Sequence, residues 1–228
     1  MDKVLVIGGS GFMGSHTADE LSKRGFDVTV FDIKPSSWLK ENQHMVVGDM
    51  LNIDDVSEAL NGAKYLYHFG GIADIDKAKE SPLETINQNV IGAAIAMEAA
   101  QNADIERLIY ASTMYVYSPY GSFYRASKQA AETVIEAYSE RCSVDYTFLR
   151  YGSLYGPRAQ NWNGLKKYVD QVIRNAKLEY TGTGQERREY IHVSDAARLS
   201  VDVLNKKNKN QAMTVTGNQV LNSNELMD

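Results

Sequence analysis

Short apolar segments alternate with longer helical patterns from the N-terminus to about residue 157. The short segments are rich in β-branched and aromatic residues and show no polar alternation, which is typical of strands that are buried on both faces. The longer segments carry apolar residues at helical spacing. We therefore predict an α/β fold, a doubly wound parallel sheet with right-handed crossovers and helices on both faces. The expected strands are residues 4–7, 28–31, 45–47, 65–69, 108–111 and 146–149, and the expected helices are residues 12–24, 54–60, 83–101 and 123–141.

The regular alternation of strands and helices ends after Gly156 and Pro157, where the sequence becomes polar and rich in asparagine. A helix at residues 165–175, a short strand at 178–181, a glycine-rich turn and a further strand–helix unit are expected there. This pattern predicts a first domain at residues 1–157 and a smaller lobe at residues 158–228, which share an interface. Residues near 189–205 are candidates to pack back on the first domain.

Composition and charge exclude several classes of protein. The 228 residues are 43% hydrophobic with a net charge of −5, and the short basic run at residues 206–209 has no interleaved aromatics, so no nucleic-acid partner is expected. Cys142 is the single cysteine and no Cys/His cluster has the spacing of metal ligands, which predicts a reducing compartment and no metal. The N-terminal apolar run is too short for a signal peptide or a membrane span, so we expect a cytoplasmic protein without a membrane partner.

A glycine-rich turn directly follows the first expected strand. Gly8, Gly11 and Gly14 lie between this strand and a helix, and Asp32 ends the second strand. Glycines allow close approach of a pyrophosphate, the helix N-terminus offers free N–H groups, and the carboxylate can bind ribose hydroxyls. The pattern predicts a Rossmann dinucleotide site, the alternative being a glycine-rich turn without a ligand. Asp32 would repel a 2′-phosphate, which favours NAD over NADP, although Lys34 weakens this inference.

A tyrosine and a lysine share one face of the expected helix at residues 123–141. Tyr124 and Lys128 are four positions apart, so their side chains are neighbours. A free tyrosine is a poor base at neutral pH, but a positive charge nearby favours the phenolate and lowers its pKa. The pair therefore predicts a proton-transfer centre, the alternative being two exposed residues on an amphipathic helix.

Seven segments of the chain, taken in order, resemble the extended short-chain dehydrogenases/reductases of the NAD-dependent epimerase/dehydratase family. Within this family, the resemblance is strongest to the UDP-glucose 4-epimerase-like enzymes. The resemblance covers nearly the whole chain. The segments are residues 8–14, 47–50, 68–72, 87–92, 112–117 together with Tyr124 and Lys128, 149–158 and 187–195. It implies that residues 1–157 bind the dinucleotide NAD and that residues 158–228 form a small substrate-binding lobe.

The resemblance also implies which residues contact the cofactor. Phe12 and Met13 resemble the backbone donors above the pyrophosphate, and Lys128 the residue that binds the nicotinamide ribose. Asn89 is a candidate for a position near the cofactor, and a structural hydrogen bond is an equal alternative for its side chain. For Asp49, the alternative to a cofactor contact is capping of the next helix. The full set is Gly8, Gly11, Phe12, Met13, Gly14, Asp32, Asp49, Met50, Phe69, Gly70, Gly71, Asn89, Tyr124, Lys128 and Gly152.

The catalytic residues implied by the resemblance are Thr113, Tyr124 and Lys128. As a phenolate, Tyr124 would take the proton of a sugar hydroxyl while the carbinol hydride passes to NAD, and Thr113 would hold the oxygen. Ser112 is the neighbour of Thr113 and a possible substitute. Two further substrate-binding candidates are Ser153, where the family often has asparagine, and Arg188, for a nucleotide diphosphate. The alternative for Arg188 is an ion pair with Glu186 or Glu189.

Departures from the family pattern narrow the reaction. Related dehydratases carry Asp-Glu directly after the threonine, and related decarboxylases usually a glutamate, whereas this chain has Met114 and Tyr115. A nucleotide-sugar 4-epimerase acting on a UDP-hexose is therefore favoured, with an NAD-dependent sugar or sugar-acid dehydrogenase/reductase and a non-catalytic NAD-binding sensor as alternatives. The connection between Tyr117 and Tyr124 is unusually short, so a more open sugar pocket is expected.

Two expectations concern the C-terminus and assembly. Asn222 and Glu225 have capping-box spacing where the family would begin another helix, so the substrate lobe is expected to be incomplete. The resemblance implies a homodimer built from the helices at 83–101 and 123–141 of two subunits. An alanine-rich face would allow close helix approach, although packing against the subunit's own sheet explains the same alanines, which are Ala93, Ala94, Ala96, Ala99 and Ala100.

Overall fold

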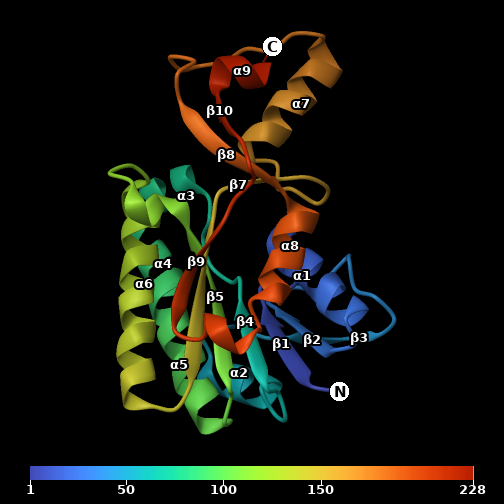
Figure 1. Ribbon diagram of the computed structural model, residues 1–228, viewed down its shortest axis with the longest axis vertical. Coiled ribbons are helices and arrows are strands. Elements are labelled where there is room, and N and C mark those ends of the chain that lie inside the picture. Colours follow the sequence, from blue (N-terminus) through green and yellow to red (C-terminus); the bar gives the residue numbers. More distant parts are fainter. Residues whose placement is uncertain (228) are drawn as a thin grey trace.

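A seven-stranded sheet forms the main body of the protein (Figure 1). The structure is a computed structural model that describes residues 1–227. The strand order is β3-β2-β1-β4-β5-β6-β9 and every neighbouring pair is parallel, which confirms the predicted doubly wound α/β fold. The strands are β1 (Lys3–Ile7), β2 (Asp27–Asp32), β3 (Gln43–Val47), β4 (Tyr65–His68), β5 (Arg107–Thr113), β6 (Asp145–Tyr151) and β9 (Gln211–Val215).

Helices cover both faces of this sheet. In β1, Leu5 and Ile7 pack into one hydrophobic core while Val4 and Val6 pack into the other, because successive side chains of a strand point to opposite faces. The first core is completed by α2 (Ile53–Ala59), α5 (Gly92–Asn102) and α6 (Ser122–Arg141). The second is completed by α1 (Phe12–Lys23) and α8 (Val193–Asp202). Burial on both faces explains why the strands lack polar alternation.

The expected helix at 83–101 is built from three parts. It comprises α4 (Pro82–Ile86), a π-helical turn η1 (Asn87–Ile91) and α5. Four of the five alanines noted in the sequence are buried in the sheet's own core and only Ala94 is partly exposed. Packing against the sheet therefore accounts for most of this alanine-rich face. A further short helix, α3 (Ile75–Glu80), was not expected from the sequence.

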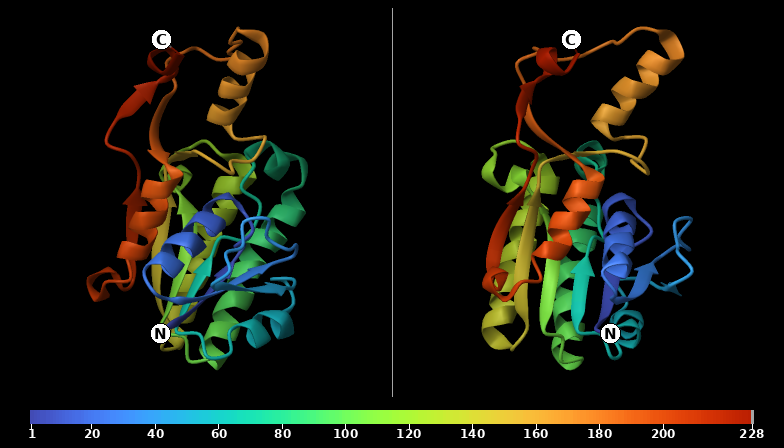
Figure 2. Two further views of the ribbon diagram at one scale, coloured as in Figure 1. Left: turned by 90° about the vertical axis from the view of Figure 1, so that its right-hand side faces the viewer. Right: turned by 45° about the vertical axis from the view of Figure 1, so that its right-hand side comes forward.

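A small lobe sits beyond the carboxyl ends of the strands (Figures 1 and 2). Its sheet has the order β10-β8-β7, and β8 pairs parallel with β7 and antiparallel with β10. The expected strand at residues 178–181 is wrong: this segment is not a strand, because both edges of β8 are already paired. The elements of the lobe are β7 (Ser153–Tyr155), α7 (Gly164–Asn175), β8 (Arg187–His192), β10 (Val220–Asn222) and α9 (Ser223–Met227).

The capping box expected near the C-terminus is present. The backbone N–H of Asn222 donates to the Glu225 carboxylate at 2.7 Å, and the N–H of Glu225 donates to Asn222 Oδ1 at 2.9 Å. These reciprocal bonds satisfy two donors at the start of α9. Leu226 and Met227 then line an apolar hollow beside α7, where Ile173 is 76% exposed.

The chain returns from the lobe to the main body. Helix α8 packs beside α1, and β9 adds to the sheet alongside β6. The two regions are therefore interleaved, and no single point near residue 157 separates them. The reason is that the crossover through α8 places the next strand at the open edge of the parallel sheet.

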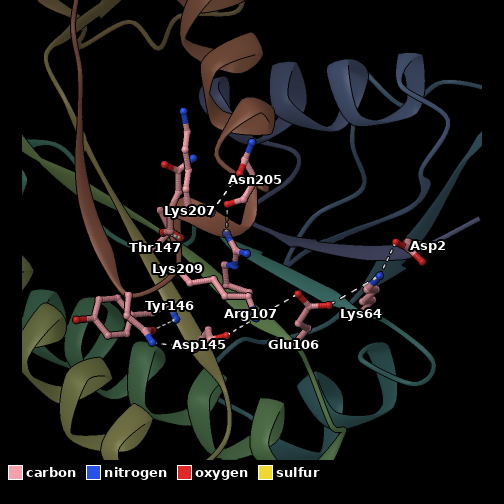
Figure 3. A network of polar contacts seen from close by, with 12 residues as sticks. Asp2, Lys64, Glu106, Arg107, Asp145, Tyr146, Thr147, Asn205, Lys207 and Lys209 are labelled. Atoms are coloured by element: carbon pink, nitrogen blue, oxygen red, sulfur yellow. Dashed lines mark hydrogen bonds and ion pairs between the residues drawn. The ribbon is translucent and has the colours of Figure 1, made fainter.

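Arg107 anchors this returning segment at the amino edge of the sheet (Figure 3). Its side chain is fully buried and donates to the carbonyl oxygens of Val203 at 2.9 Å and Asn205 at 3.3 Å. Nearby, Lys209 bridges Glu106 at 3.4 Å and Asp145 at 2.6 Å. These contacts join the connection after α8 to β5 and β6, far along the strands from the edge that faces the small lobe.

Candidate active site

The glycine-rich turn after β1 is closely packed. Gly8 has a φ of +73°, and a Cβ added to it would lie 2.5 Å from the backbone nitrogen of Gly70. A Cβ on Gly14 would lie 2.2 Å from the carbonyl oxygen of Gly8. Helix α1 begins directly after its N-cap residue Gly11, so Phe12 and Met13 belong to the first turn, whose N–H groups have no partner within the helix. The loop and helix end therefore fit a pyrophosphate.

Asp32 is held beside this turn. Its Oδ2 accepts from the backbone N–H of Ser10 at 3.1 Å, and its Oδ1 accepts from the backbone N–H of Lys34 at 3.4 Å. The contact from Lys34 thus comes from its backbone and not from its ammonium group. The carboxylate at the end of β2 fits the binding of ribose hydroxyls.

Asp49 and Met50 follow β3 at the same edge of the sheet. Asp49 accepts from the N–H of Leu51 at 2.9 Å, while Asn52 is the N-cap of α2. The helix-capping alternative for Asp49 is therefore wrong, because Asn52 performs that role. Met50 is buried, and a Cβ added to Gly70 would lie 2.4 Å from its sulfur. Met50 therefore packs against the turn that follows β4.

Asn89 fastens the segment that follows β4. Its Oδ1 accepts from the N–H of Ile72 at 2.7 Å, and its Nδ2 donates to Ile72 O and to Ser127 Oγ, both at 2.9 Å. Both amide protons are used, so the structural role left open by the sequence is the one observed. Gly71 has a φ of +129°, and a Cβ there would lie 2.3 Å from Asn89 Oδ1. Phe69 stacks on Tyr67 with ring centroids 6.1 Å apart.

Tyr124 and Thr113 come together from α6 and the end of β5. Tyr124 is 9% exposed, and burial raises the pKa of its hydroxyl to about 12. A hydrogen bond from Thr113 opposes part of this rise in the pKa. Thr113 also accepts from the backbone N–H of Tyr115 at 3.2 Å. The two hydroxyls expected at the reacting oxygen are therefore neighbours.

Lys128 is turned toward β5. Its Nζ donates to Ala111 O at 2.7 Å and to the hydroxyl of Tyr110 at 3.2 Å. Burial lowers the pKa of Lys128 to about 7, against an opposing effect of Glu132. Burial of the phenol therefore dominates the pKa of Tyr124 in this structure, and the Lys128 ammonium hydrogen-bonds to other groups. The lowering of the Tyr124 pKa by Lys128 stays a prediction.

Ser112 faces away from Thr113, since neighbouring residues of a strand point to opposite sides. Its hydroxyl donates to Glu132 Oε1 at 2.5 Å. Glu132 also pairs with Arg150 through two hydrogen bonds, of 3.0 and 2.5 Å, and Arg150 donates to the hydroxyl of Tyr117. The Ser112 hydroxyl is therefore hydrogen-bonded to a buried ion pair, and this contact does not favour Ser112 as a substitute for Thr113.

The start of β7 lies close to the returning chain. The N–H of Gly152 donates to Val215 O at 3.0 Å, and a Cβ on Gly152 would lie 2.7 Å from Glu189 O. The N–H is therefore occupied, and only the remaining backbone atoms of Gly152 are available to a ligand. Ser153 begins β7, opposite Tyr190 of β8.

Arg188 reaches from β8 to the residue beside Thr113. Its Nη1 donates to the hydroxyl of Tyr115 at 3.1 Å, and the Tyr115 ring meets the Tyr124 ring edge to face with centroids 6.3 Å apart. Glu186 instead accepts from Tyr180 and Thr183. The ion pair considered for Arg188 is thus absent among residues 1–227.

The sequence assigned no role in this site to three residues, namely Glu132, Arg150 and Tyr115. Glu132 follows Lys128 by four positions, a spacing that signals a shared helix face and could have identified it. No comparable signal marks Arg150 or Tyr115. Over the described part of the chain, no cluster of three or more His, Cys, Asp or Glu side chains could hold a metal ion. None of the helices within residues 1–227 has the length and apolar character needed to cross a membrane.

Comparisons with known proteins agree with this arrangement. The model of the NAD dependent epimerase/dehydratase family matches residues 4–216. A putative UDP-glucose 4-epimerase of Methanocaldococcus jannaschii is 26% identical over 99% of this chain and 80% of the relative. A UDP-N-acetyl-alpha-D-glucosaminuronate decarboxylase of Bacillus cytotoxicus is 27% identical over 90% of this chain and 72% of the relative.

Solved structures share the fold. The UDP-glucose 4-epimerase of Thermotoga maritima, with UDP-glucose, has a TM-score of 0.91 at 23% identity and covers 98% of this chain and 80% of its own. MoeE5, in complex with UDP-glucose and NAD, has a TM-score of 0.88 at 23% identity, over 99% of this chain and 79% of its own. The family match spans most of the chain, and the glycine turn with Asp32 fits the dinucleotide. The chain therefore belongs to the NAD-dependent epimerase/dehydratase family of extended short-chain dehydrogenases/reductases and is an enzyme with NAD as its cofactor.

Proposed function

We propose that the protein is a nucleotide-sugar 4-epimerase, with a UDP-hexose as the favoured substrate. The observation that carries the proposal is the Thr113–Tyr124 pair, flanked by Met114 and Tyr115 where elimination would need carboxylates. Relatives include a putative UDP-glucose 4-epimerase, a UDP-N-acetyl-alpha-D-glucosaminuronate decarboxylase and a dTDP-D-glucose 4,6-dehydratase. Water loss and decarboxylation lack an evident acid or base beside Thr113, so reversible oxidation is favoured.

Each side chain of the site has a role in this reaction. Tyr124 takes the proton of the sugar C4 hydroxyl and later returns it, while Thr113 hydrogen-bonds the same oxygen. Lys128 has three ammonium protons and uses two on Ala111 and Tyr110, which leaves one for the nicotinamide ribose. Bound NAD would supply a reversible hydride acceptor, inversion at C4 would require the keto sugar to regain the hydride on its opposite face, and the cationic nicotinamide ring would favour the phenolate. Arg188 binds the diphosphate of the sugar nucleotide.

The raised pKa of Tyr124 keeps its side chain as the neutral phenol in the free protein at neutral pH. With a pKa of about 12, very little phenolate is present at neutral pH. Proton removal therefore depends on the positive charge of the nicotinamide ring that NAD brings into the site, and on the hydrogen bond from Thr113. This dependence keeps the base inactive until the site is filled.

The test is conversion of a UDP-hexose without added cofactor. The protein as purified, saturated with NAD and freed of excess, is incubated with UDP-glucose, and UDP-galactose is measured by NMR. Conversion without NADH is expected for the wild type and for Tyr120→Phe, an exposed control, and none for Tyr124→Phe. Stoichiometric NADH would instead support a sugar or sugar-acid dehydrogenase, and bound NAD with no turnover on a panel of sugar nucleotides would support a non-catalytic sensor.

We also propose that the protein is a homodimer. Apolar side chains on α4, η1 and α6 are exposed, namely Leu83, Ile86, Ile91 and Phe123. These helices lie side by side on one flank of the sheet (Figure 1). Their burial against a second copy would remove this apolar surface from water. Light scattering on the wild type and on Ile86→Glu tests this, and a wild-type monomer at micromolar concentration would rule it out.

A further inference from the structure

Tyr115 occupies the middle of the candidate site and has no part in the function proposed above. It belongs to the short 3₁₀ helix η2 (Met114–Tyr117). Its ring meets that of Tyr124 edge to face, with centroids 6.3 Å apart and planes at 74°. Its backbone N–H donates to Thr113 Oγ1 at 3.2 Å. Tyr115 thus contacts both residues assigned to the reacting oxygen.

The hydroxyl of Tyr115 has a defined role in its bond with Arg188. The distance from Arg188 Nη1 to the Tyr115 oxygen is 3.1 Å. A guanidinium group has no acceptor, so the tyrosine oxygen must accept and its own proton stays available. Among residues 1–227 no acceptor takes that proton. The two side chains therefore present several N–H groups and one O–H group in one place.

Arg188 carries a charge that the described residues do not neutralise. No carboxylate lies within ion-pair distance of it in the described chain, and Glu186 is bound by Tyr180 and Thr183 instead. An uncompensated guanidinium beside a free hydroxyl proton fits a phosphate group, which has several acceptor oxygens and negative charge.

The ring of Tyr115 is also packed against Gly121. Gly121 has a φ of +102°, and a Cβ added to it would lie 2.9 Å from Tyr115 Cδ1. The short connection between Tyr117 and Tyr124 therefore closes against this ring. A ligand group bound by Arg188 and the Tyr115 hydroxyl is separated from Tyr124 by one aromatic side chain.

We propose that Tyr115 is a substrate-positioning residue that donates its hydroxyl proton to a phosphate oxygen of the sugar nucleotide bound by Arg188. The inference rests on the proposed function and assigns the phosphate next to the sugar to this pair. Because the Tyr115 ring also contacts Tyr124, binding of this phosphate sets the distance between the sugar and the base. The short connection after Tyr117 is then a feature of substrate recognition.

The experiment compares ligand binding in four forms of the NAD-loaded protein. Calorimetry measures the Kd of UDP-glucose and of UDP for the wild type, Tyr115→Phe, Arg188→Lys and the double variant. Tyr115→Phe keeps the ring and its packing and removes only the hydroxyl. It is expected to raise both Kd values about tenfold. In the double variant, the increase in Kd should be smaller than the product of the two single increases, because the two side chains act together. Tyr120→Phe, 76% exposed on the same connection, is the matched control.

The outcomes separate this inference from the proposed function. The Kd of NAD and the urea midpoint of Tyr115→Phe should equal those of the wild type, which a merely structural role would change. If the wild type binds UDP-glucose and Tyr115→Phe binds it equally well, or the two substitutions are additive, Tyr115 is not a positioning residue while the epimerase proposal stands. If the wild type binds neither UDP-glucose nor UDP, both proposals fail.

Discussion

The Nζ of Lys128 lies 3.2 Å from the hydroxyl oxygen of Tyr110 and 4.6 Å from the centre of the Tyr110 ring. The same hydroxyl donates to Asn89 O at 3.5 Å. Tyr110 therefore joins the buried ammonium group to the helix that carries Asn89. This contact and the bond to Ala111 O, and not a contact with Tyr124, orient Lys128 in the site.

Replacing Tyr110 with phenylalanine should make Lys128 easier to deprotonate. The ring and its packing on Phe148 remain, but the charged ammonium loses one of its two hydrogen-bond acceptors. The alkaline limb of the pH profile of kcat/KM is expected to move to lower pH, with about a tenfold loss of activity at neutral pH. Tyr146→Phe, on the neighbouring strand, is the control. An unchanged profile would show that Tyr110 does not govern Lys128.

Lys128→Met should stabilise the cofactor-free protein at neutral pH. The pKa of Lys128 is about 7 in the folded protein and 10.5 as its ordinary value, so the unfolded chain binds more protons between these values. Wild-type stability should therefore rise from about pH 7 to pH 10.5 and be lowest below pH 7. The methionine variant removes this dependence and should gain on the order of 3 kcal/mol at pH 6. Urea unfolding at several pH values measures it, and parallel pH curves for the two proteins would contradict it.

Glu132→Gln should destabilise the fold through the charge that it leaves behind. The side chains of Glu132 and Arg150 are only 9% and 18% exposed, and they are joined by two hydrogen bonds. Removing one partner of a buried ion pair leaves the charge of the other uncompensated in an apolar environment, which lowers the free energy of unfolding by about 3 kcal/mol. Urea unfolding of Glu132→Gln tests this.

The matched control for the ion pair is Glu179→Gln. Glu179 pairs with Lys177, but their side chains are 76% and 70% exposed. Exposed pairs contribute little, so a change below about 1 kcal/mol is expected. Equal effects of the two substitutions would mean that burial does not decide the contribution of the Glu132–Arg150 pair.

Much of the fold and the place of the site followed from local sequence features. The glycine turn and Asp32 were predictable because the turn follows one apolar strand and Asp32 ends the next, and strands of a parallel sheet end at one edge. The role of Thr113 came from the family resemblance. Tyr124 was predictable from its helix and its spacing to Lys128. These features depend only on residues that are close together in the sequence.

The orientation of individual side chains could not be predicted. Lys128 turns to Tyr110 and Ala111 because β5 lies beneath its helix, and this depends on tertiary packing. The contact between Tyr115 and Arg188 joins residues 73 positions apart and has no signature in the sequence. The erroneous strand at 178–181 has the same cause, since strand formation depends on a free neighbouring edge.

Gly14→Ala should weaken NAD binding strongly, while Gly164→Ala should not. A Cβ on Gly14 would lie 2.2 Å from the Gly8 carbonyl oxygen, and the three nearest atoms are all backbone atoms of Gly8 and Gly9, so no side chain could move aside. The turn must then open, which displaces the N–H groups of Phe12 and the first turn of α1. The Kd of NAD, measured by calorimetry, is expected to rise at least about a hundredfold.

Gly164 provides the comparison because, like Gly14, it lies in the first turn of a helix. A Cβ there would meet no atom within 4 Å, and alanine favours the helical backbone. Gly164→Ala should leave the Kd of NAD unchanged and raise the free energy of unfolding slightly. If Gly14→Ala bound NAD as tightly as the wild type, close packing of the turn against Gly8 would not be what shapes the dinucleotide site. The pair of variants thus separates a glycine required by close backbone approach from one that is not.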